Sequence, residues 1–256
     1  MLKVRDLHFR HKEGSIDVLK GISFNAPRGT ITSILGPNGS GKTTLFKCIS
    51  GLWKAQKGEI TFDEKPVTRL SPKARAKIFS IVFQDHQPSF PFSVIDVVLL
   101  GRTSYIGVFS VPSLKDYEIA SSAISTVGIE SLRDTPYTQI SGGERQLTLI
   151  ARALAQDAPC MLLDEPTSHL DFRNQIEILK KVRELALRKN LAVLITLHDP
   201  NLAMLFSDRV IVINSGMKVA EGNPKEVINE EMMKRVYKID VNIISSGENK
   251  MVYPRT

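Results

Sequence analysis

The sequence predicts an α/β fold with a mostly parallel sheet, an N-terminal antiparallel β subdomain and an inserted helical subdomain. Short apolar runs alternate with amphipathic helical patterns through most of the chain, as in sheets covered by helices. A glycine-rich segment stands between one such run and a helix. Between about residues 87 and 140 the strand pattern gives way to helices, which indicates an insertion. We treat residues 1–256 as one domain that contains it.

The N-terminal region has the pattern of antiparallel strands. Residues 2–10 alternate apolar and polar side chains, as a half-exposed strand does. Residues 16–19 and 22–24 are its expected partners, and Pro27-Arg28-Gly29 is expected to turn the chain into a buried strand at 31–35.

The glycine-rich segment Gly36-Pro37-Asn38-Gly39-Ser40-Gly41-Lys42-Thr43 follows that strand and precedes a helix at 44–50. Its spacing is that of a phosphate-binding P-loop, G-x-x-x-x-G-K-[ST], in the required strand–loop–helix context. Glycines let successive N–H groups point at phosphate oxygens, and the helix N-terminus adds a positive dipole end. Lys42 can neutralise phosphate charge and the Thr43 hydroxyl can ligate Mg²⁺. The core is therefore expected to be that of a P-loop NTPase, rather than a glycine-rich turn with a chance lysine.

The remaining elements follow in order. Before the insertion we expect a strand at 57–62, a helix starting at Ser71-Pro72, and a buried strand at 78–83 that ends at Gln84. The insertion has helical patterns at 94–101 and 113–127. After it we expect helices at 144–156 and 173–189, strands at 160–163 and 192–197, a hairpin of 210–213 with 218–221, helices from Asn223-Pro224 and at 230–237, and short strands near Val241 and Val252.

Composition sets broad limits. The chain of 256 residues is 42% hydrophobic and 24% charged, which is ordinary for a soluble globular protein. It has no apolar run of 18 or more residues and starts with a charged stretch, so we expect neither a membrane span nor a signal peptide. Cys48 and Cys160 lie in apolar contexts and are expected to be buried thiols in a reducing cytoplasm. The net charge of +7 is scattered, which favours a mildly basic surface over a nucleic-acid or lipid site.

Two further segments carry chemistry in this context. Asp164 and Glu165 end the apolar run 160–163; in a P-loop fold the first acid belongs near Mg²⁺ and the second can polarise the attacking water. Without the P-loop they would be an ordinary strand end. Ser141-Gly142-Gly143 starts a helix, where Ser141 is a good N-cap. A plain cap is the alternative, but a cap needs no second glycine, so this helix start is also expected to face phosphate.

The chain resembles the ATP-binding cassette (ABC) ATPases over its whole length. The ordered motifs that carry the resemblance are Gly36–Thr43, Gln84, Ser141–Gln146, Leu162–Pro166, Ser168-His169-Leu170-Asp171 and His198. The resemblance implies that two subunits dock head to tail, with each ATP between one subunit's P-loop and the other's Ser141, Gly142 and Gly143.

The resemblance also implies roles for individual residues. Glu165 is the catalytic base, His198 contacts the γ-phosphate, and Asp171 belongs to the segment that links the two sites. Mg²⁺ is held by Thr43, by Gln84, which also senses the membrane partner, and by Asp164 through water. The ATP-binding residues are Gly36, Pro37, Asn38, Gly39, Ser40, Gly41, Lys42, Thr43 and Thr44, with Lys42 also catalytic. Gln84 as a strand-end polar residue and His198 as a buried histidine are the alternatives.

The sequence departs from the family pattern at two positions. His11 stands where an aromatic ring usually stacks on adenine; imidazole can stack, although less well. Glu144 replaces the glutamine that commonly follows Ser-Gly-Gly. An acid in the first turn of a helix suits the dipole but would repel a γ-phosphate, so we expect Glu144 to point away.

Three stretches resemble the ATPases of iron-siderophore, haem and cobalamin importers: Leu99–Tyr105, Asp164–Asp171 with its Ser-His variant, and the tail of Tyr237–Val241 and Val252–Arg255. Molybdate or tungstate importers look similar. The implied protein is a peripheral ATPase subunit at the cytoplasmic face of the cell membrane. Its partners are a second copy, integral-membrane permease subunits and, indirectly, a substrate-binding protein; no nucleic acid is expected. The alternatives are a cytosolic cassette ATPase acting on nucleic acid or an assembly scaffold, and a non-catalytic nucleotide sensor, which the complete motif set disfavours.

Residues 87–111 are expected to form a groove for a permease helix. This segment is rich in large apolar residues for a solvated connection: Phe90, Phe92, Tyr105, Ile106, Val108 and Phe109. An amphipathic helix could lay its apolar face there. The alternative is that these residues pack the helical subdomain.

Overall fold

The computed structural model describes residues 1–12, 16–83, 91–107, 110–247 and 249–255. The chain divides into two compact units, Met1–Arg69 with Leu185–Thr256, and Leu70–Glu184. The helices expected at about 87–140 lie within the second unit. Gln84, Phe90, Val108 and Phe109 lie outside the described residues.

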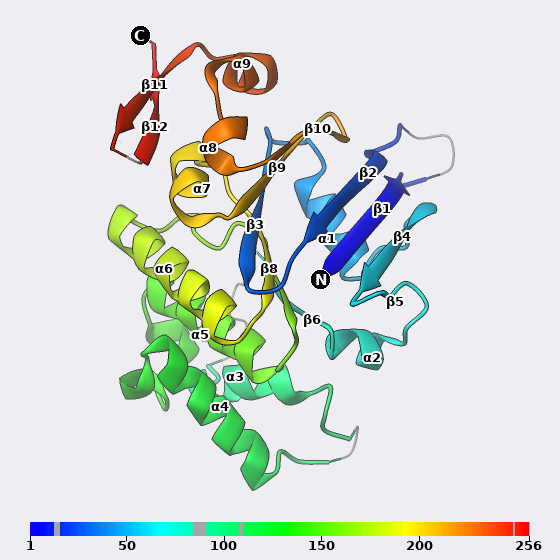
Figure 1. Ribbon diagram of the computed structural model, residues 1–256. Helices are drawn as coiled ribbons and strands as arrows, with labels where there is room; N and C mark the ends of the chain where they lie inside the picture. Colours follow the sequence, from blue (N-terminus) through cyan, green and yellow to red (C-terminus); the bar gives the residue numbers. More distant parts are fainter. Residues whose placement is uncertain (13–15, 84–90, 108–109, 248, 256) are drawn as a thin grey trace. The chain divides into compact units, whose positions relative to one another are not determined.

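The N-terminal antiparallel sheet belongs to the first unit. Its strands are β1 (Leu2–Phe9), β2 (Leu19–Ala26), β4 (Lys57–Phe62) and β5 (Lys65–Pro66), in the order β2-β1-β4-β5 (Figure 1). The expectation of a strand at 16–19 is wrong in its start. Ile16 is 85% exposed, and the paired strand begins only at Leu19.

The apolar residues of β1 do not alternate strictly, and a β-bulge explains the break. Leu2 and Val4 are buried, and the next buried apolar residue, Leu7, follows after three positions instead of two. Asp6 has a φ of 46°, and the register with β2 shifts between Val4 and Leu7. The extra residue returns the later side chains to the buried face. Gly58 of β4 leaves room for the bulge, because a Cβ there would lie 2.6 Å from the Asp6 carbonyl oxygen.

The parallel strands of the first unit lie side by side in Figure 1. Strand β3 (Thr30–Leu35) pairs in parallel with β8 (Ala192–Thr196) and with β9 (Arg209–Asn214), and β10 (Met217–Gly222) is antiparallel to β9. Strand β8 is buried throughout and β3 is buried from its second residue, as expected for strands covered on both faces.

The other elements of this unit are α1 (Lys42–Ile49), α7 (Pro200–Phe206), α8 (Pro224–Val227), α9 (Glu230–Met232), a π-helical turn at Met233–Tyr237, and the hairpin of β11 (Val241–Ser246) with β12 (Asn249–Pro254). The helix expected at 230–237 is therefore a short α-helix that widens into a π-helical turn. Lys238 ends this turn in a left-handed conformation.

The second unit contains a parallel strand pair and the helical elements. Its elements are α2 (Pro72–Ala76), β6 (Phe79–Val82), α3 (Val94–Leu99), a 3₁₀ turn at Leu100–Arg102, α4 (Leu114–Val127), 3₁₀ turns at Glu130–Leu132 and Tyr137–Gln139, α5 (Gly142–Ala155), β7 (Cys160–Leu163) and α6 (Phe172–Arg188), in which the chain passes back into the first unit. Strands β6 and β7 pair in parallel, and α3, α4 and α5 pack against one another (Figure 1). The predicted cap at Ser71 is confirmed, since its hydroxyl accepts a hydrogen bond from the Ala74 amide.

The two cysteines are buried thiols, as expected. Burial raises the pKa of the Cys48 thiol to about 12. Among the described residues, no helix is long and apolar enough to cross a membrane.

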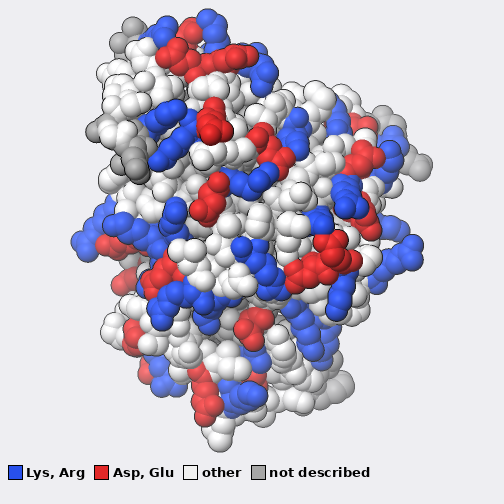
Figure 2. Space-filling model, in the orientation of Figure 1, with Lys and Arg blue, Asp and Glu red and all other residues white. Residues whose placement is uncertain are grey.

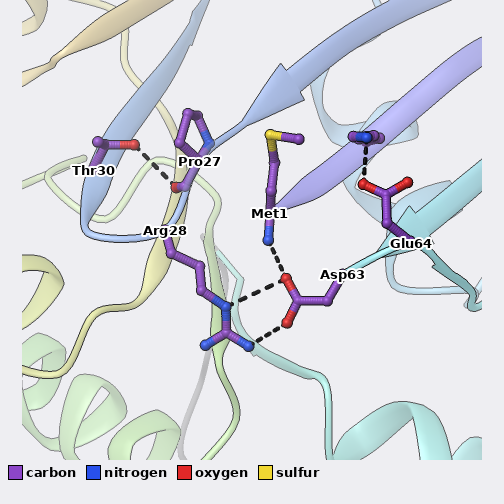
Figure 3. Close-up of polar contacts among 7 residues, drawn as sticks. Met1, Pro27, Arg28, Thr30, Asp63 and Glu64 are labelled. Atoms are coloured by element: carbon purple, nitrogen blue, oxygen red, sulfur yellow. Dashed lines mark hydrogen bonds and ion pairs between the residues drawn. The ribbon is translucent and has the colours of Figure 1, made fainter.

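A charge cluster closes the turn between β4 and β5 (Figure 3). Asp63 and Glu64 form this turn with φ angles of 47° and 63°. The Arg28 guanidinium donates to Asp63 through Nη2 at 2.5 Å and Nε at 3.4 Å, and the Met1 amino group also donates to Asp63. The hydrogen bond from Arg28 is the main reason why the pKa of Asp63 falls to about 2.

We predict that Asp63→Asn removes a small, pH-dependent part of the stability. The folded-state pKa lies below the ordinary value of 3.8, so the contribution is present above about pH 4 and is lost as the pH falls toward 2. Because the Asp63 side chain is 44% exposed, solvent screens the pair and the expected loss is only about 0.5 kcal/mol. Asparagine tolerates left-handed backbone as aspartate does, so the substitution tests the charge. Urea unfolding at several pH values measures the difference; a difference that stays constant from pH 7 to pH 2.5 would contradict the assignment.

Candidate functional site

The phosphate loop connects β3 to α1 and has no space for side chains at two of its glycines. Gly36 has a φ of 155°, and a Cβ there would lie 2.1 Å from the carbonyl oxygen of Ile213 in β9. Gly41 has a φ of 106°, and its Cβ would lie 2.9 Å from the Leu19 side chain. These contacts are with neighbouring strands, so the loop conformation is set by packing as well as by glycine's freedom.

The interior of the loop has the donors that an anion requires. The buried Lys42 ammonium donates to the carbonyl oxygens of Gly36 at 2.8 Å and Pro37 at 3.2 Å. Helix α1 starts after Gly41 without a side-chain cap and without an acidic residue in its first turn. The Ser40 hydroxyl is buried and has no hydrogen-bond partner in the part of the chain that the structure describes. A phosphate group fits this set of groups, because its oxygens accept hydrogen bonds from N–H and O–H donors.

His198 lies at the same sheet edge as the loop. Ile34 of β3 pairs with Thr196 of β8, and the Leu197 amide donates to the Ile34 carbonyl at 3.3 Å. His198 therefore follows β8 at the level where Gly36 follows β3. It is exposed, which excludes the alternative of a buried histidine. Ligands of parallel α/β sheets bind at this carboxyl edge.

His11 belongs to an aromatic cluster at the start of the chain. Its ring centroid is 5.2 Å from that of Phe9 and 5.0 Å from that of Trp53, both in edge contacts, and Phe9 stacks on Trp53. The Lys47 ammonium of α1 lies 4.3 Å from the Trp53 ring centroid. The exposed imidazole is thus held beside the helix that begins at the phosphate loop. Our sequence reasoning missed Trp53, the single tryptophan of the chain, although it closely follows that helix.

The paired acids lie in the second unit, at the end of β7. Asp164 is buried, and its amide donates to the carbonyl of Val82 at the end of β6 at 2.8 Å. Glu165 has a φ of 52°, a left-handed conformation that is uncommon for a residue with a side chain. The Ser168 hydroxyl and amide donate to the Glu165 carboxylate at 3.2 Å and to its carbonyl at 3.1 Å. The 164–168 turn therefore fixes the direction of the Glu165 carboxylate.

The Ser-Gly-Gly segment caps α5 with a capping box. The Ser141 hydroxyl accepts from the Glu144 amide at 3.3 Å, and the Ser141 amide donates to the Glu144 carboxylate at 2.8 Å. Bonds to the Ser141 hydroxyl and amide lower the pKa of Glu144. The carboxylate folds back on its own helix start, which explains how an acid is accommodated here.

The structure gives an explanation for Gly143, the second glycine of the segment, that was not evident from the sequence. A Cβ on Gly143 would lie 2.9–3.1 Å from the side-chain atoms of Asn174 in α6. Asn174 in turn donates to the Asp171 carboxylate, from its amide at 2.8 Å and from Nδ2 at 2.9 Å. The close contact with Asn174 is a second explanation for this glycine, so its presence is weaker evidence for a phosphate site than expected.

Asn174 joins two of the predicted motifs. Ser141, Gly143, Glu144, Asp171 and Asn174 are among the residues that line one polar cavity of about 370 Å³. The spacing from Asp171 to Asn174 is that of a helix cap and could have suggested the contact.

The predicted residues thus form two groups. The first unit holds the loop from Gly36 to Thr44, with Thr43 exposed in the first turn of α1, together with His198 and His11. The second unit holds Asp164, Glu165, the Ser141–Gly143 start of α5, and Asp171. Gln84 lies outside the described residues, so its expected role stays a prediction.

Known proteins that are similar to this chain belong to the family that the sequence motifs indicated. The family profile described as ABC transporter matches residues 19–168. A probable iron chelatin transport ATP-binding protein of Helicobacter pylori is 35% identical over 99% of both chains. A hemin import ATP-binding protein of Thermobifida fusca is 32% identical over 97% of this chain and 84% of its own.

Solved structures agree with these relatives. A metal-chelate type ABC transporter in an inward-facing conformation matches with a TM-score of 0.86 and 28% identity, over 100% of this chain and 97% of that one. A dimeric bacterial ABC transporter cassette matches with a TM-score of 0.75 and 28% identity, over 88% and 99%. With the phosphate loop, the paired acids and the Ser-Gly-Gly helix start in place, the chain belongs to the ABC transporter family as an ATP-binding cassette ATPase.

Proposed function

We propose that this ATPase powers an importer for a metal-chelate compound, of the class of iron-siderophore, haem or cobalamin complexes. The observation that carries the proposal is the phosphate loop, with its buried lysine and uncapped helix start, in a chain similar over nearly its whole length to iron chelatin and hemin transport ATP-binding proteins. The ATPase subunit sits at the cytoplasmic face of the membrane, on permease subunits that receive cargo from a substrate-binding protein.

Each group of predicted residues has its own role in the binding or hydrolysis of ATP. Lys42 and the N–H groups of the loop hold the β- and γ-phosphates. Thr43, Gln84 and Asp164, the last through water, would hold Mg²⁺, which would neutralise phosphate charge. Glu165 orients the attacking water and His198 contacts the γ-phosphate. His11 stacks on adenine. Asp171 belongs to the segment that links the two nucleotide sites.

Two copies complete each site in this proposal. Each chain has one phosphate loop and one Ser141–Gly143 helix start, so a head-to-tail dimer places ATP between the loop of one copy and the helix start of the other. The dimeric structure of a related cassette supports this arrangement. The Ser141 amide and hydroxyl are shared with Glu144 in the capping box, and the next N–H groups of α5 are the donors toward the partner's phosphate.

A cytosolic ATPase that acts on nucleic acid remains the alternative function. A nucleic-acid interface gathers Lys and Arg into a patch or stripe. On the face shown in Figure 2, basic and acidic side chains are interspersed. This distribution supports the transporter over the alternative.

A groove in the second unit supports the permease contact. A cavity of about 550 Å³ is lined by Asp96, Leu99, Leu100, Thr103, Ile106, Gly107, Ser110, Pro112 and Tyr117. Of the apolar residues proposed from the sequence, Ile106 is among them. Tyr105 instead packs against Arg102 and Lys77, with cation-to-centroid distances of 3.9 and 5.2 Å. The groove also extends beyond residue 111, to Tyr117 of α4. Its apolar lining suits one face of an amphipathic helix.

We predict that Lys42→Ala and Glu165→Gln separate nucleotide binding from hydrolysis. Lys42→Ala should weaken ATP binding by about tenfold or more, because it removes the charge that faces the phosphates. Glu165→Gln should bind ATP and run as a dimer in size-exclusion chromatography, while its kcat falls by about 10²-fold or more. The control Glu130→Gln removes a surface carboxylate that bonds to Ser125 and should behave as wild type. A Glu165→Gln protein that is monomeric at every ATP concentration, with and without permease, would count against the sandwich.

We predict that a charge in the groove abolishes permease assembly without unfolding the protein. Leu100 is 49% exposed and Tyr117 is 39% exposed, so glutamate at either position should be tolerated by the fold. Burying that charge against an apolar helix should weaken co-purification with the permease by at least about tenfold, with the ATPase activity of the isolated subunit retained. Leu187→Glu, at a 64% exposed site on α6, is the matched control. Normal assembly and transport by both groove variants would refute the assignment.

A further inference from the structure

Arg102 precedes the groove residue Thr103 and is almost completely buried, with 6% of its surface exposed. Thr103 and Tyr117, which follow Arg102 and Asp116 in the chain, both line the groove. The Arg102 Nε donates to the Asp116 Oδ1 at 3.1 Å. One buried ion pair therefore joins the two segments that carry these lining residues, the 3₁₀ turn and α4.

The other side of the guanidinium binds the end of α5. Its Nη1 donates to the carbonyl oxygen of Ala155 at 2.8 Å. This carbonyl is in the last turn of α5, where carbonyls lack partners within the helix and a cation is favourable. The plane of the guanidinium also lies against the Tyr105 ring, 3.9 Å from its centroid.

Gly101, which precedes Arg102, brings the 3₁₀ turn into close contact with α5. A Cβ on Gly101 would lie 2.2 Å from the carbonyl oxygen of Arg152. Glycine thus allows the 3₁₀ turn to contact the backbone of α5. Asp116 is in turn fixed by Ser113, whose hydroxyl and amide both donate to its second carboxylate oxygen. These bonds, the Ser113 hydroxyl first, hold the pKa of Asp116 below its usual value, so the carboxylate stays charged beside Arg102.

Helix α5 connects this contact to the nucleotide-facing segment. It begins at the Ser141 cap and ends at Ala155, so its 14 residues span about 20 Å. We propose that Arg102 is a positioning residue that fastens the permease groove to the C-terminal end of α5, so that the groove and the Ser141–Gly143 helix start move as one body. A push on the groove then displaces the residues that close on the partner's ATP. This inference rests on the proposed function of the groove.

Arg102→Lys tests the proposal in the assembled transporter. Lysine keeps a charge for Asp116, but a single ammonium cannot reproduce the rigid fork that binds Asp116 and Ala155 together while stacking on Tyr105. We expect the isolated variant to bind ATP and the permease within about threefold of wild type, whereas stimulation of its ATPase by the permease in proteoliposomes falls at least about fivefold.

A stability-matched control separates coupling from folding. Ile124→Ala removes a buried side chain of α4, 1% exposed, and should lower the melting temperature while leaving Arg102, Asp116 and Ala155 unchanged. Its permease stimulation should be that of wild type. Normal stimulation of Arg102→Lys, or an equal loss in Ile124→Ala, would overturn the proposal.

Two other results have to be considered: a variant that does not fold, and a wild-type chain that does not respond to the permease. If Arg102→Lys does not fold, Asp116→Asn, which is isosteric, weakens the bond to Arg102 and should reduce stimulation at least about threefold; unchanged stimulation would overturn the inference. If the wild-type chain neither assembles with the permease nor is stimulated by it, the proposed function fails, and this result is distinct from failure of the role proposed for Arg102.

Discussion

The constraint on which this molecule depends is the lack of space around its phosphate loop. The β9 carbonyl at Gly36 and the Leu19 side chain at Gly41 leave no room for a Cβ, so the loop is held between two strands of the first unit. The register of β3 with β8 then places His198 at the same edge. Binding chemistry follows from this backbone: the helix start is uncapped and Lys42 is buried against the carbonyls of the loop.

The second unit contains polar contacts between segments that lie far apart in the chain. Asn174 bonds to Asp171 and lies close to Gly143 at the start of α5, while Arg102 bonds the other end of α5 to Asp116 of α4. The Arg102 side chain donates two hydrogen bonds, to Asp116 and Ala155, and the Asn174 side chain donates one, to Asp171. Such contacts are specific in direction, which suits a part that has to transmit a displacement.

The fold class and the phosphate-loop motif were predictable from the sequence because both depend on patterns among residues that are close together in the chain. Apolar periodicity gave the strands, and the spacing of glycine, lysine and threonine gave the loop. Contacts between distant residues were not predictable in this way. Trp53 beside His11, Asn174 against Gly143, and the Arg102–Asp116 pair depend on tertiary packing. The bulge at Asp6 could have been suspected from the sequence, because the step from Val4 to Leu7 breaks the alternation of apolar and polar residues.

The most direct test of the account is whether each ATP is bound by two chains. Lys42→Ala disables the loop, and Ser141→Arg disables the helix start, so neither variant alone can form a complete site. Mixing the two gives mixed dimers with one intact site, and random pairing should restore about a quarter of the wild-type ATP occluded at equilibrium. Restoration on mixing is the predicted result. A mixture that occludes no more ATP than either variant alone, under conditions where wild type does, would contradict the account.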